Sequence, residues 1–385
     1  TPAAGLRYGA LAAPLAFVAL PLYVLLPAHY ASVHGVPLAA LGALLLALRL
    51  ADAGIDPAIG RWIDASFARS RAVVLRLAAA AALLLAAGFA ALFFPPAALH
   101  GDVGALLAWC GVTLAVTYLG FSVLGVLHQA WGTRLGGDAA GRARVAGWRE
   151  GLALAGVLAA SVLPALAGLP ALVVVFVALL VVGLLALARA AWPPAPAPNA
   201  FAPPSSWRRP WGEAAFRRLL LVYLLNGIAS AVPATLVLFF VRDRLQAPAW
   251  EPAFLGLYFL AGALSVPLWV RIVARVGLVR AWLAGMALAV LAFIWAAALG
   301  PGDAVAFAVV CAASGLALGA DLTVPAALLT GVVQRAGDAG RAEGVYLGWW
   351  NGATKLNLAL AAGLALPLLQ ALGYQPGRTD AAGLQ

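Results

Sequence analysis

The chain has 385 residues, of which 64% are hydrophobic and 10% are charged, and its mean hydropathy is +0.98. A soluble domain of this size could not bury so much apolar surface, so the composition excludes soluble proteins and indicates a membrane protein. The net charge of +10 would suggest nucleic-acid binding in a soluble protein, but here its distribution indicates membrane topology, and we expect no nucleic-acid partner.

Alanine, leucine and valine fill repeated blocks that can cross a hydrocarbon core of ~30 Å as helices rising ~1.5 Å per residue. The alternation of apolar and polar residues that marks a transmembrane barrel does not occur in these blocks. We therefore expect an all-α membrane protein with eleven crossings, at roughly residues 6–30, 37–62, 72–94, 104–131, 144–168, 170–192, 214–241, 252–275, 279–300, 304–331 and 342–372. The tail GYQPGRTDAAGLQ ends where we expect a twelfth crossing to begin.

Arginine supplies 23 of the 24 basic residues, and the arginines alternate along the chain. They gather in the connections after the second, fourth, sixth, eighth and tenth crossings, whereas the opposite loops hold few of them. The positive-inside rule then predicts a cytoplasmic amino terminus, in a multi-pass protein of the plasma membrane, of the bacterial inner-membrane kind.

One polar, proline-rich stretch, WPPAPAPNAFAPPSSWRRPW at residues 192–211, interrupts the apolar blocks near the middle of the chain. We interpret it as a cytoplasmic linker at 193–213 between a first bundle at 1–192 and a second bundle at 214–385. Parallel repeats of six spans are typical of major facilitator transporters, so the pattern predicts the major facilitator fold with two six-helix halves.

Three charges interrupt the second crossing, in the stretch LRLADAGIDPAIG: Arg49, Asp52 and Asp56. Each charge costs about 2.5 to 3.5 kcal/mol near the bilayer centre, so three unpaired charges would together cost roughly 8 to 10 kcal/mol. Their spacing places all three on one helical face, where Arg49 can neutralise Asp52 and leave Asp56 for a cation. These acids occur in the first half only, because the matching part of the eighth crossing carries none.

The proline that follows these acids adds an oxygen to the same place. Pro57 has no N–H, so the carbonyl of Ala53 loses its helical donor. Carboxylate and carbonyl oxygens then lie together, as in sites that hold a sodium ion or a proton inside a membrane. The alternative is an internal salt-bridge cluster that only stiffens the bundle.

The chain's only lysine, Lys355, falls in the eleventh crossing, roughly 21 Å along the helix from the cytoplasmic Arg341. A lysine can lose its proton when it is desolvated, whereas an arginine cannot. We expect Lys355 to approach Asp52 or Asp56, so that a proton or cation on the acids competes with its ammonium group. The alternative is a lysine whose head reaches an interface.

Further charged residues are candidates for a cytoplasmic gate and for binding the substrate. Arg142, Arg341 and Asp321 are candidates for a cytoplasmic gate, although Arg142 also fits a loop anchor and Asp321, close to Pro325, also fits a helix kink. Arg149 lies deeper in the fifth crossing and is a candidate to reach the central cavity.

Enzyme motifs are missing: the sequence has no P-loop, no His/Cys metal-ligand spacing and no nucleophile elbow. We therefore expect neither an enzyme nor a cofactor, apart from a coupling ion that is H⁺ or Na⁺. The expected partners are a small-molecule substrate and the lipid bilayer, and we expect a monomer.

These motifs resemble the glycoside–pentoside–hexuronide cation symporters, the melibiose permease group of the major facilitator superfamily. The likeness runs over nearly the whole chain, through RLADAGIDPAIG and RWID, GRARVAGWR, SGLALGAD, GRAEG, and a lysine before a GY turn. The resemblance implies that Asp52 and Asp56 bind the coupling cation, and that Arg149 and Lys355 line the transport path.

Two departures from the family concern the ion and the solute. The permease has an asparagine where this chain has Ile55, so an amide that could complete a sodium shell is missing and a proton is favoured over sodium. The stretches LAAPLAF and YLGFSVLG lack the family's sugar-binding acids, which recognise hydroxyls as bidentate acceptors.

Aromatic and amide side chains remain as candidates to line a substrate pocket, and they fit a sugar or an amphipathic solute. They are Tyr23, Gln129, Trp131, Asn226, Trp350, Asn351 and Thr354. The resulting hypothesis is cation-coupled symport of a small, sugar-like solute by alternating access. One alternative is transport of a lysolipid or other amphipathic molecule, as in related eukaryotic members; another is a membrane sensor or scaffold that transports nothing.

Overall fold

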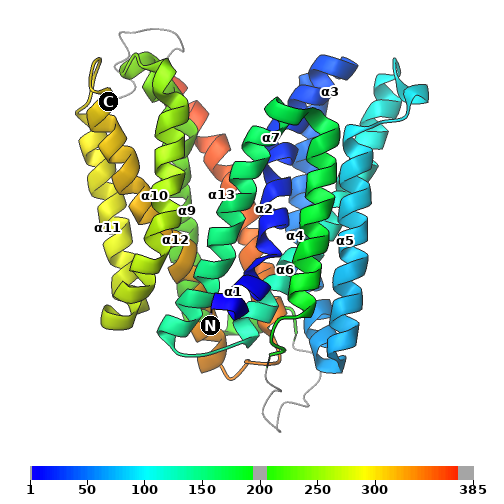
Figure 1. Ribbon diagram of the computed structural model, residues 1–385, viewed down its shortest axis with the longest axis vertical. Coiled ribbons are helices and arrows are strands. Elements are labelled where there is room, and N and C mark those ends of the chain that lie inside the picture. Colours follow the sequence, from blue (N-terminus) through cyan, green and yellow to red (C-terminus); the bar gives the residue numbers. More distant parts are fainter. Residues whose placement is uncertain (1, 194–205, 372–385) are drawn as a thin grey trace. The chain divides into compact units, whose positions relative to one another are not determined.

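The computed structural model describes residues 2–193 and 206–371, and in these ranges the chain folds into helices with no strand (Figure 1). The all-α prediction is therefore confirmed. The expected twelfth crossing and most of the proline-rich linker lie outside the described residues.

Two compact units divide the chain. Unit 1 comprises Thr1–Gly136, Trp148–Glu213 and Val332–Gly352, and unit 2 comprises Gly137–Gly147, Ala214–Gly331 and Ala353–Gln385. Two short segments thus depart from the expected halves: residues 137–147 group with the second unit, and residues 332–352 group with the first.

Unit 1 begins with the first expected crossing, which is divided into short helices, one of them starting at Pro21. Its leading helices are α1 (Pro2–Gly9), α2 (Ala12–Leu20), the short η1 (Pro21–Leu25), α3 (Leu26–His34), α4 (Leu38–Arg69), α5 (Arg71–Phe93), η2 (Ala97–Leu99) and α6 (Val103–Arg134). Side-chain caps explain where two of them start, because Ser70 accepts from the Val73 N–H at 3.3 Å and Asp102 from the Ala105 N–H at 3.0 Å.

The fifth and sixth expected crossings form one continuous element, α7 (Ala139–Ala188), with a break in its middle. Gly168 has φ 76° and ψ 179°, a left-handed φ that glycine adopts without steric penalty, and Pro164 and Pro170 flank it. The break falls where the sequence places the boundary between these crossings.

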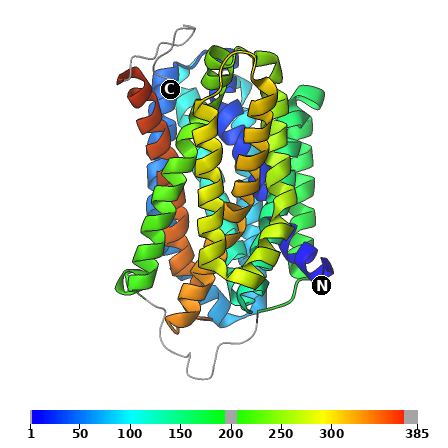
Figure 2. The same ribbon diagram turned by 90° about the vertical axis from the view of Figure 1, so that its left-hand side faces the viewer.

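Unit 2 carries the helices of the second half, which lie side by side in Figures 1 and 2. They are α9 (Ala214–Phe239), η4 (Phe240–Arg244), η5 (Pro248–Trp250), α10 (Glu251–Val276), α11 (Leu278–Ala297), α12 (Ala304–Arg335) and α13 (Glu343–Ala371), whose first turns belong to unit 1. The short α8 (Arg209–Gly212) precedes them in unit 1. A core of buried side chains from α10, α11 and α12, including Trp269, Trp282 and Val324, holds these helices together.

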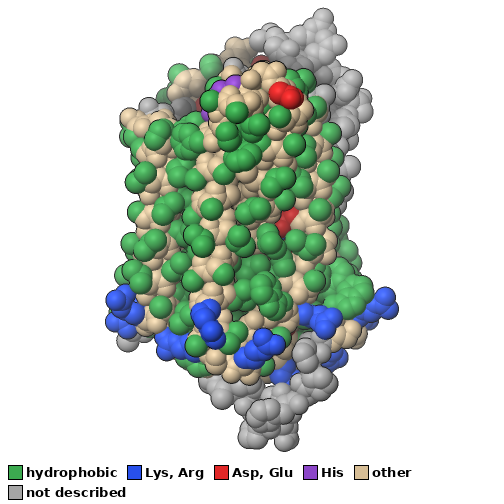
Figure 3. Space-filling view, turned by 90° about the vertical axis from the view of Figure 1, so that its right-hand side faces the viewer, with side chains coloured by type: hydrophobic (Ala, Val, Ile, Leu, Met, Phe, Trp, Pro, Cys, Tyr) green, Lys and Arg blue, Asp and Glu red, His purple; other side chains and the backbone are tan. Residues whose placement is uncertain are grey.

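Eight helical segments of the described chain are long and apolar enough to cross a membrane, or nine if the bent pair α1 and α2 forms one crossing. The helices α4 and α13 are 32 and 29 residues long, sufficient for a ~30 Å core, and they hold the predicted buried charges. These numbers are compatible with the eleven predicted crossings. On the face in Figure 3, hydrophobic side chains cover most of the surface and basic side chains form a band near one end.

Candidate functional site

The two acids of α4 are buried in unit 1. Asp52 is 4% exposed and Asp56 is 0% exposed, whereas Arg49 on the same face is half-buried. Ser122 of α6 donates its hydroxyl to Asp52 Oδ1 at 2.7 Å, and the Arg49 guanidinium carbon lies 5.9 Å from the centre of the Tyr118 ring, also on α6. The α4–α6 interface therefore supplies a hydroxyl to the Asp52 carboxylate and an aromatic ring to the Arg49 side chain.

The first turns of α13 pack on the same part of α4 through glycines. A side-chain carbon on Gly348 would collide with the Asp56 carbonyl, and one on Gly352 would lie 2.8 Å from the Ala53 carbonyl oxygen. The carbonyl that Pro57 leaves without its helical donor thus lies against the α13 backbone. Small residues at four-residue spacing allow this close approach of two helices inside a membrane.

Ile55 does not share the burial of the acids. Its side chain is 42% exposed, while Asp52 and Asp56 are both buried. The position at which the permease has an amide is therefore not packed beside the carboxylates in this arrangement, and the preference for a proton over sodium stays a prediction.

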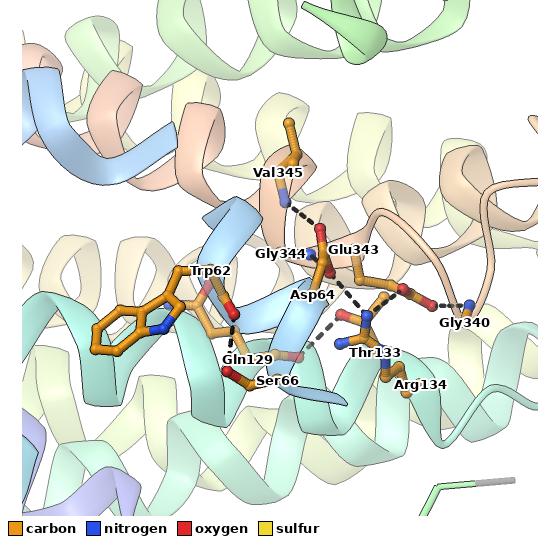
Figure 4. A network of polar contacts seen from close by, with 10 residues as sticks. All are labelled: Trp62, Asp64, Ser66, Gln129, Thr133, Arg134, Gly340, Glu343, Gly344 and Val345. Carbon is orange, nitrogen blue, oxygen red and sulfur yellow. Dashed lines mark hydrogen bonds and ion pairs between the residues drawn. The ribbon is translucent and has the colours of Figure 1, made fainter. Parts of the chain in front are cut away.

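A second charged network, which the sequence reasoning missed, joins α4, α6 and α13 within unit 1 (Figure 4). Arg134 Nη2 lies 2.7 Å from Asp64 Oδ1 and 2.9 Å from Glu343 Oε2, and all three side chains are at most 4% exposed. The Arg134 guanidinium carbon also lies 4.1 Å from the centre of the Phe67 ring, within the range of a cation–π contact.

The same network caps the start of α13. Asp64 accepts hydrogen bonds from the backbone N–H groups of Gly344 at 2.7 Å and Val345 at 3.0 Å, which have no partner inside their helix. The Glu343 carboxylate accepts from the Gly340 N–H. A carboxylate near a helix amino terminus is also favoured by the helix dipole, so Asp64 fixes α13 onto the end of α4.

Another acid, Asp338, stabilises the loop before α13. Its Oδ2 lies 3.1 Å from Arg209 Nε of α8 and accepts from the Tyr346 hydroxyl at 2.8 Å. Burial lowers the pKa of Arg209, but the Asp338 carboxylate, together with Tyr346 and Glu213, raises the pKa above its ordinary value. The Arg209 guanidinium therefore stays charged at neutral pH.

Two other predicted residues of unit 1, Arg149 and Trp131, contact side chains and backbone groups of unit 1. Arg149 forms an ion pair with its neighbour Glu150, with Nε 2.9 Å from Oε1. Trp131 is fully buried, donates its indole N–H to the Ala191 carbonyl at 2.9 Å and packs against Phe67 and Trp192, so contact with a solute would require repacking.

The other unit 1 candidates differ in how far their side chains are buried. Gln129, Asn351 and Arg341 are half-buried, and Trp350 is 6% exposed. The side chain of Tyr23 lies outside what the structure describes.

Unit 2 holds a polar group around Asp321. Asp321 Oδ1 accepts from Trp282 Nε1 of α11 at 2.7 Å and from Asn226 Nδ2 of α9 at 3.1 Å. Nearby on α9, the Tyr223 hydroxyl lies 2.9 Å from the Thr354 hydroxyl of α13. The structure therefore brings three predicted residues, Asn226, Asp321 and Thr354, into one unit. It places beside them one tyrosine, Tyr223, and one tryptophan, Trp282, which the sequence analysis did not single out.

Two predicted cations also belong to unit 2. Lys355 is 8% exposed on α13, and Arg142 donates through Nη1 to the Gly137 carbonyl at 2.7 Å. The expected approach of Lys355 to the acids of α4 stays a prediction, as does the gating role of Arg142.

Buried acids in the middle of a membrane span can take up a proton or coordinate a hard cation. Without such acids, moving a cation into the bilayer core has a high free-energy cost. In residues 2–193 and 206–371, no group of three His, Cys, Asp or Glu side chains is arranged to hold a metal ion. An all-helical chain of long apolar spans with buried carboxylates has the features of a helical membrane transporter.

The chain belongs to the family described as MFS/sugar transport protein, whose model matches residues 6–385. The solved structure of the E. coli fucose:proton symporter is similar, with a TM-score of 0.69 and 14% identity over 99% of this chain and 93% of that chain. A bacterial homologue of the iron transporter ferroportin, in an outward-facing state, has a TM-score of 0.67 and 18% identity over 100% and 94%. At these identities the likeness shows the fold alone. A comparison with curated proteins found no match.

Proposed function

We propose that this transporter is a cation-coupled symporter of a small, sugar-like solute, in which Asp52 and Asp56 take up the coupling ion. The observation that carries the proposal is the complete burial of Asp56 and the near-complete burial of Asp52 in the middle of an apolar helix. Both lie roughly 20 to 25 Å along α4 from the arginine that ends it, far from either interface. Acids at that depth are expensive, so they are retained where an ion pathway needs them.

Three further points support the proposal. The family description names sugar transport, and the E. coli protein of similar fold is described as a fucose:proton symporter. The likeness of RLADAGIDPAIG to the glycoside–pentoside–hexuronide symporters also suggests a cation role for these acids. The coupling ion is proposed to be a proton, with sodium as the alternative.

Ion binding is proposed to act through conformational equilibrium. An ion that binds one state of the transporter better than another shifts the population towards that state. When an ion neutralises the α4 acids, the free-energy barrier to moving their helix face past apolar side chains falls. Only the protein that has bound the ion therefore switches between its two conformations. This is alternating access, in which uphill uptake needs the acids and exchange at equal concentrations does not.

The test uses the full chain in proteoliposomes, with imposed pH or sodium gradients and labelled melibiose, L-fucose and lysophosphatidylcholine as solutes. Asp52→Asn and Asp56→Asn should each abolish gradient-driven accumulation while exchange survives. Asp102→Asn is the matched control, because this exposed acid only caps α6 and asparagine is also a good cap. Unchanged accumulation in both α4 variants would refute the coupling role, and transport of none of the solutes by the parent protein would refute the solute class.

A further inference from the structure

The carboxylate of Asp321 lies in the middle of α12, roughly 21 Å along the helix from Arg335 at the cytoplasmic end. Both of its hydrogen bonds reach the same oxygen: Trp282 Nε1 and Asn226 Nδ2 both donate to Oδ1. Within the described part of the chain, Oδ2 accepts no hydrogen bond, and no Lys, Arg or His pairs with this acid. The carboxylate is therefore held in place by neutral donors, with one oxygen still able to accept.

A second acceptor lies next to the same stretch of α9. Asn357 of α13 is 6% exposed, and its amide nitrogen lies against Gly227, the residue after Asn226. Its Oδ1 is buried and has no hydrogen-bond partner among the described residues. An unsatisfied buried amide oxygen is costly, and such a group in a native structure calls for a donor from a ligand or from water.

The two acceptors thus lie on α12 and α13, and each contacts one of two consecutive residues of α9. The Tyr223 and Thr354 hydroxyls, 2.9 Å apart, lie one turn away on α9 and three residues before Asn357 on α13. Carboxylate, amide, hydroxyl and indole groups in one unit are the side chains that recognise hydroxyl groups and sugar rings.

We propose that Asp321 and Asn357 are hydroxyl-binding residues of a substrate site in unit 2, and that its ligand is a polyhydroxylated solute of the sugar class. This inference rests on the proposed transport of a sugar-like solute and assigns the acceptor that the first half lacks. In the first and fourth crossings the family's sugar-binding acids are missing, and the carboxylate of α12 takes over their chemistry from the other half of the chain.

The chemistry of the two acceptors disfavours a lysolipid. Two hydroxyl groups of a sugar supply two donors, one for Asp321 Oδ2 and one for Asn357 Oδ1. A phosphate ester would repel the carboxylate, and a quaternary ammonium head has no N–H or O–H donor for the amide oxygen. A sugar satisfies both acceptors without adding an unpaired charge.

The test measures equilibrium binding of labelled melibiose and L-fucose to the full chain in detergent, with no ion gradient. Asp321→Asn keeps the shape but loses a charge-assisted bond, so sugar affinity should fall about 10- to 100-fold. Asn357→Leu should weaken it about 2- to 10-fold, since it removes a neutral acceptor. Asp303→Asn is the matched control, because that exposed acid precedes α12 and accepts from the Gly300 N–H, and its affinity should equal that of the parent protein.

The outcomes separate this inference from the proposed coupling. Loss of sugar binding in the Asp321 and Asn357 variants, with binding retained in Asp52→Asn and Asp56→Asn, supports it. Unchanged sugar affinity in Asp321→Asn overturns the inference. An Asp321→Asn protein that binds and exchanges sugar but fails to accumulate it also overturns the inference, because Asp321 would then be a proton carrier. If Asp321→Asn does not fold, the Asn357 variant decides. Binding of lysophosphatidylcholine and of neither sugar by the parent protein also overturns the inference.

Discussion

Among the residues that the structure describes, Arg134 is the only cation paired with Asp64 and Glu343, so its removal is the sharpest test of the network in unit 1. In Arg134→Met, the two carboxylates stay in place with side chains 2% and 1% exposed. Asp64 would keep its bonds from the Gly344 and Val345 N–H groups, and Glu343 its bond from Gly340. These backbone donors stabilise each negative charge but do not neutralise it.

The expected magnitude follows from that geometry. Removing one member of a buried ion pair costs about 3 to 5 kcal/mol, because the remaining charge stays uncompensated. At roughly 2 to 4 °C per kcal/mol, the unfolding midpoint should fall by about 10 °C. Adding Asp64→Asn removes one of the two uncompensated charges, so the double variant should be less destabilised than the sum of the single variants by about 1 to 3 kcal/mol.

The assay is thermal unfolding of the purified protein in detergent, at neutral pH. Arg76→Met is the control, since this exposed side chain of α5 bonds only the Ala72 carbonyl of its own helix. A midpoint equal to that of the parent, or a double variant that shows the full sum of both losses, would refute the reasoning.

Two further predictions concern packing and the α12 site. Gly348→Leu should lower the unfolding midpoint by several degrees, because overpacking costs about 1 to 3 kcal/mol. Gly54→Leu, on the open side of α4, should leave the midpoint unchanged. Equal midpoints for the two variants would contradict the close α4–α13 contact. Trp282→Phe removes the 2.7 Å donor to Asp321 and should weaken melibiose binding about 10-fold, whereas Trp295→Phe, exposed on the same helix, should leave it unchanged.

Local patterns account for the predictions that agree with the structure. Apolar blocks of span length predict helices, because every backbone group in a membrane must be satisfied within its own segment. The break between the fifth and sixth crossings also follows from local chemistry, since Gly168 and its flanking prolines act through their own backbone. The spacing of Asp52 and Asp56 places both on one helical face, and both side chains are buried.

Contacts between distant segments were beyond the reach of the sequence. Asp64 and Glu343 occur in the RWID and GRAEG motifs at the ends of their crossings, where charges usually face water, and nothing local distinguishes them from the other loop charges. Only packing reveals that Asp64 meets residues 280 positions away and that Arg134 joins both acids.

By itself, the sequence determined the helical class, the membrane setting and the positions of the spans, because hydropathy and helix breakers act over one or two turns. The tertiary structure alone decided which charges share a site. It gave Asp321 its two donors from residues 39 and 95 positions away, and it exposed Ile55 while burying the acids on either side. The physical reason is that a charge acts on its spatial neighbours, whose identity depends on how the helices pack.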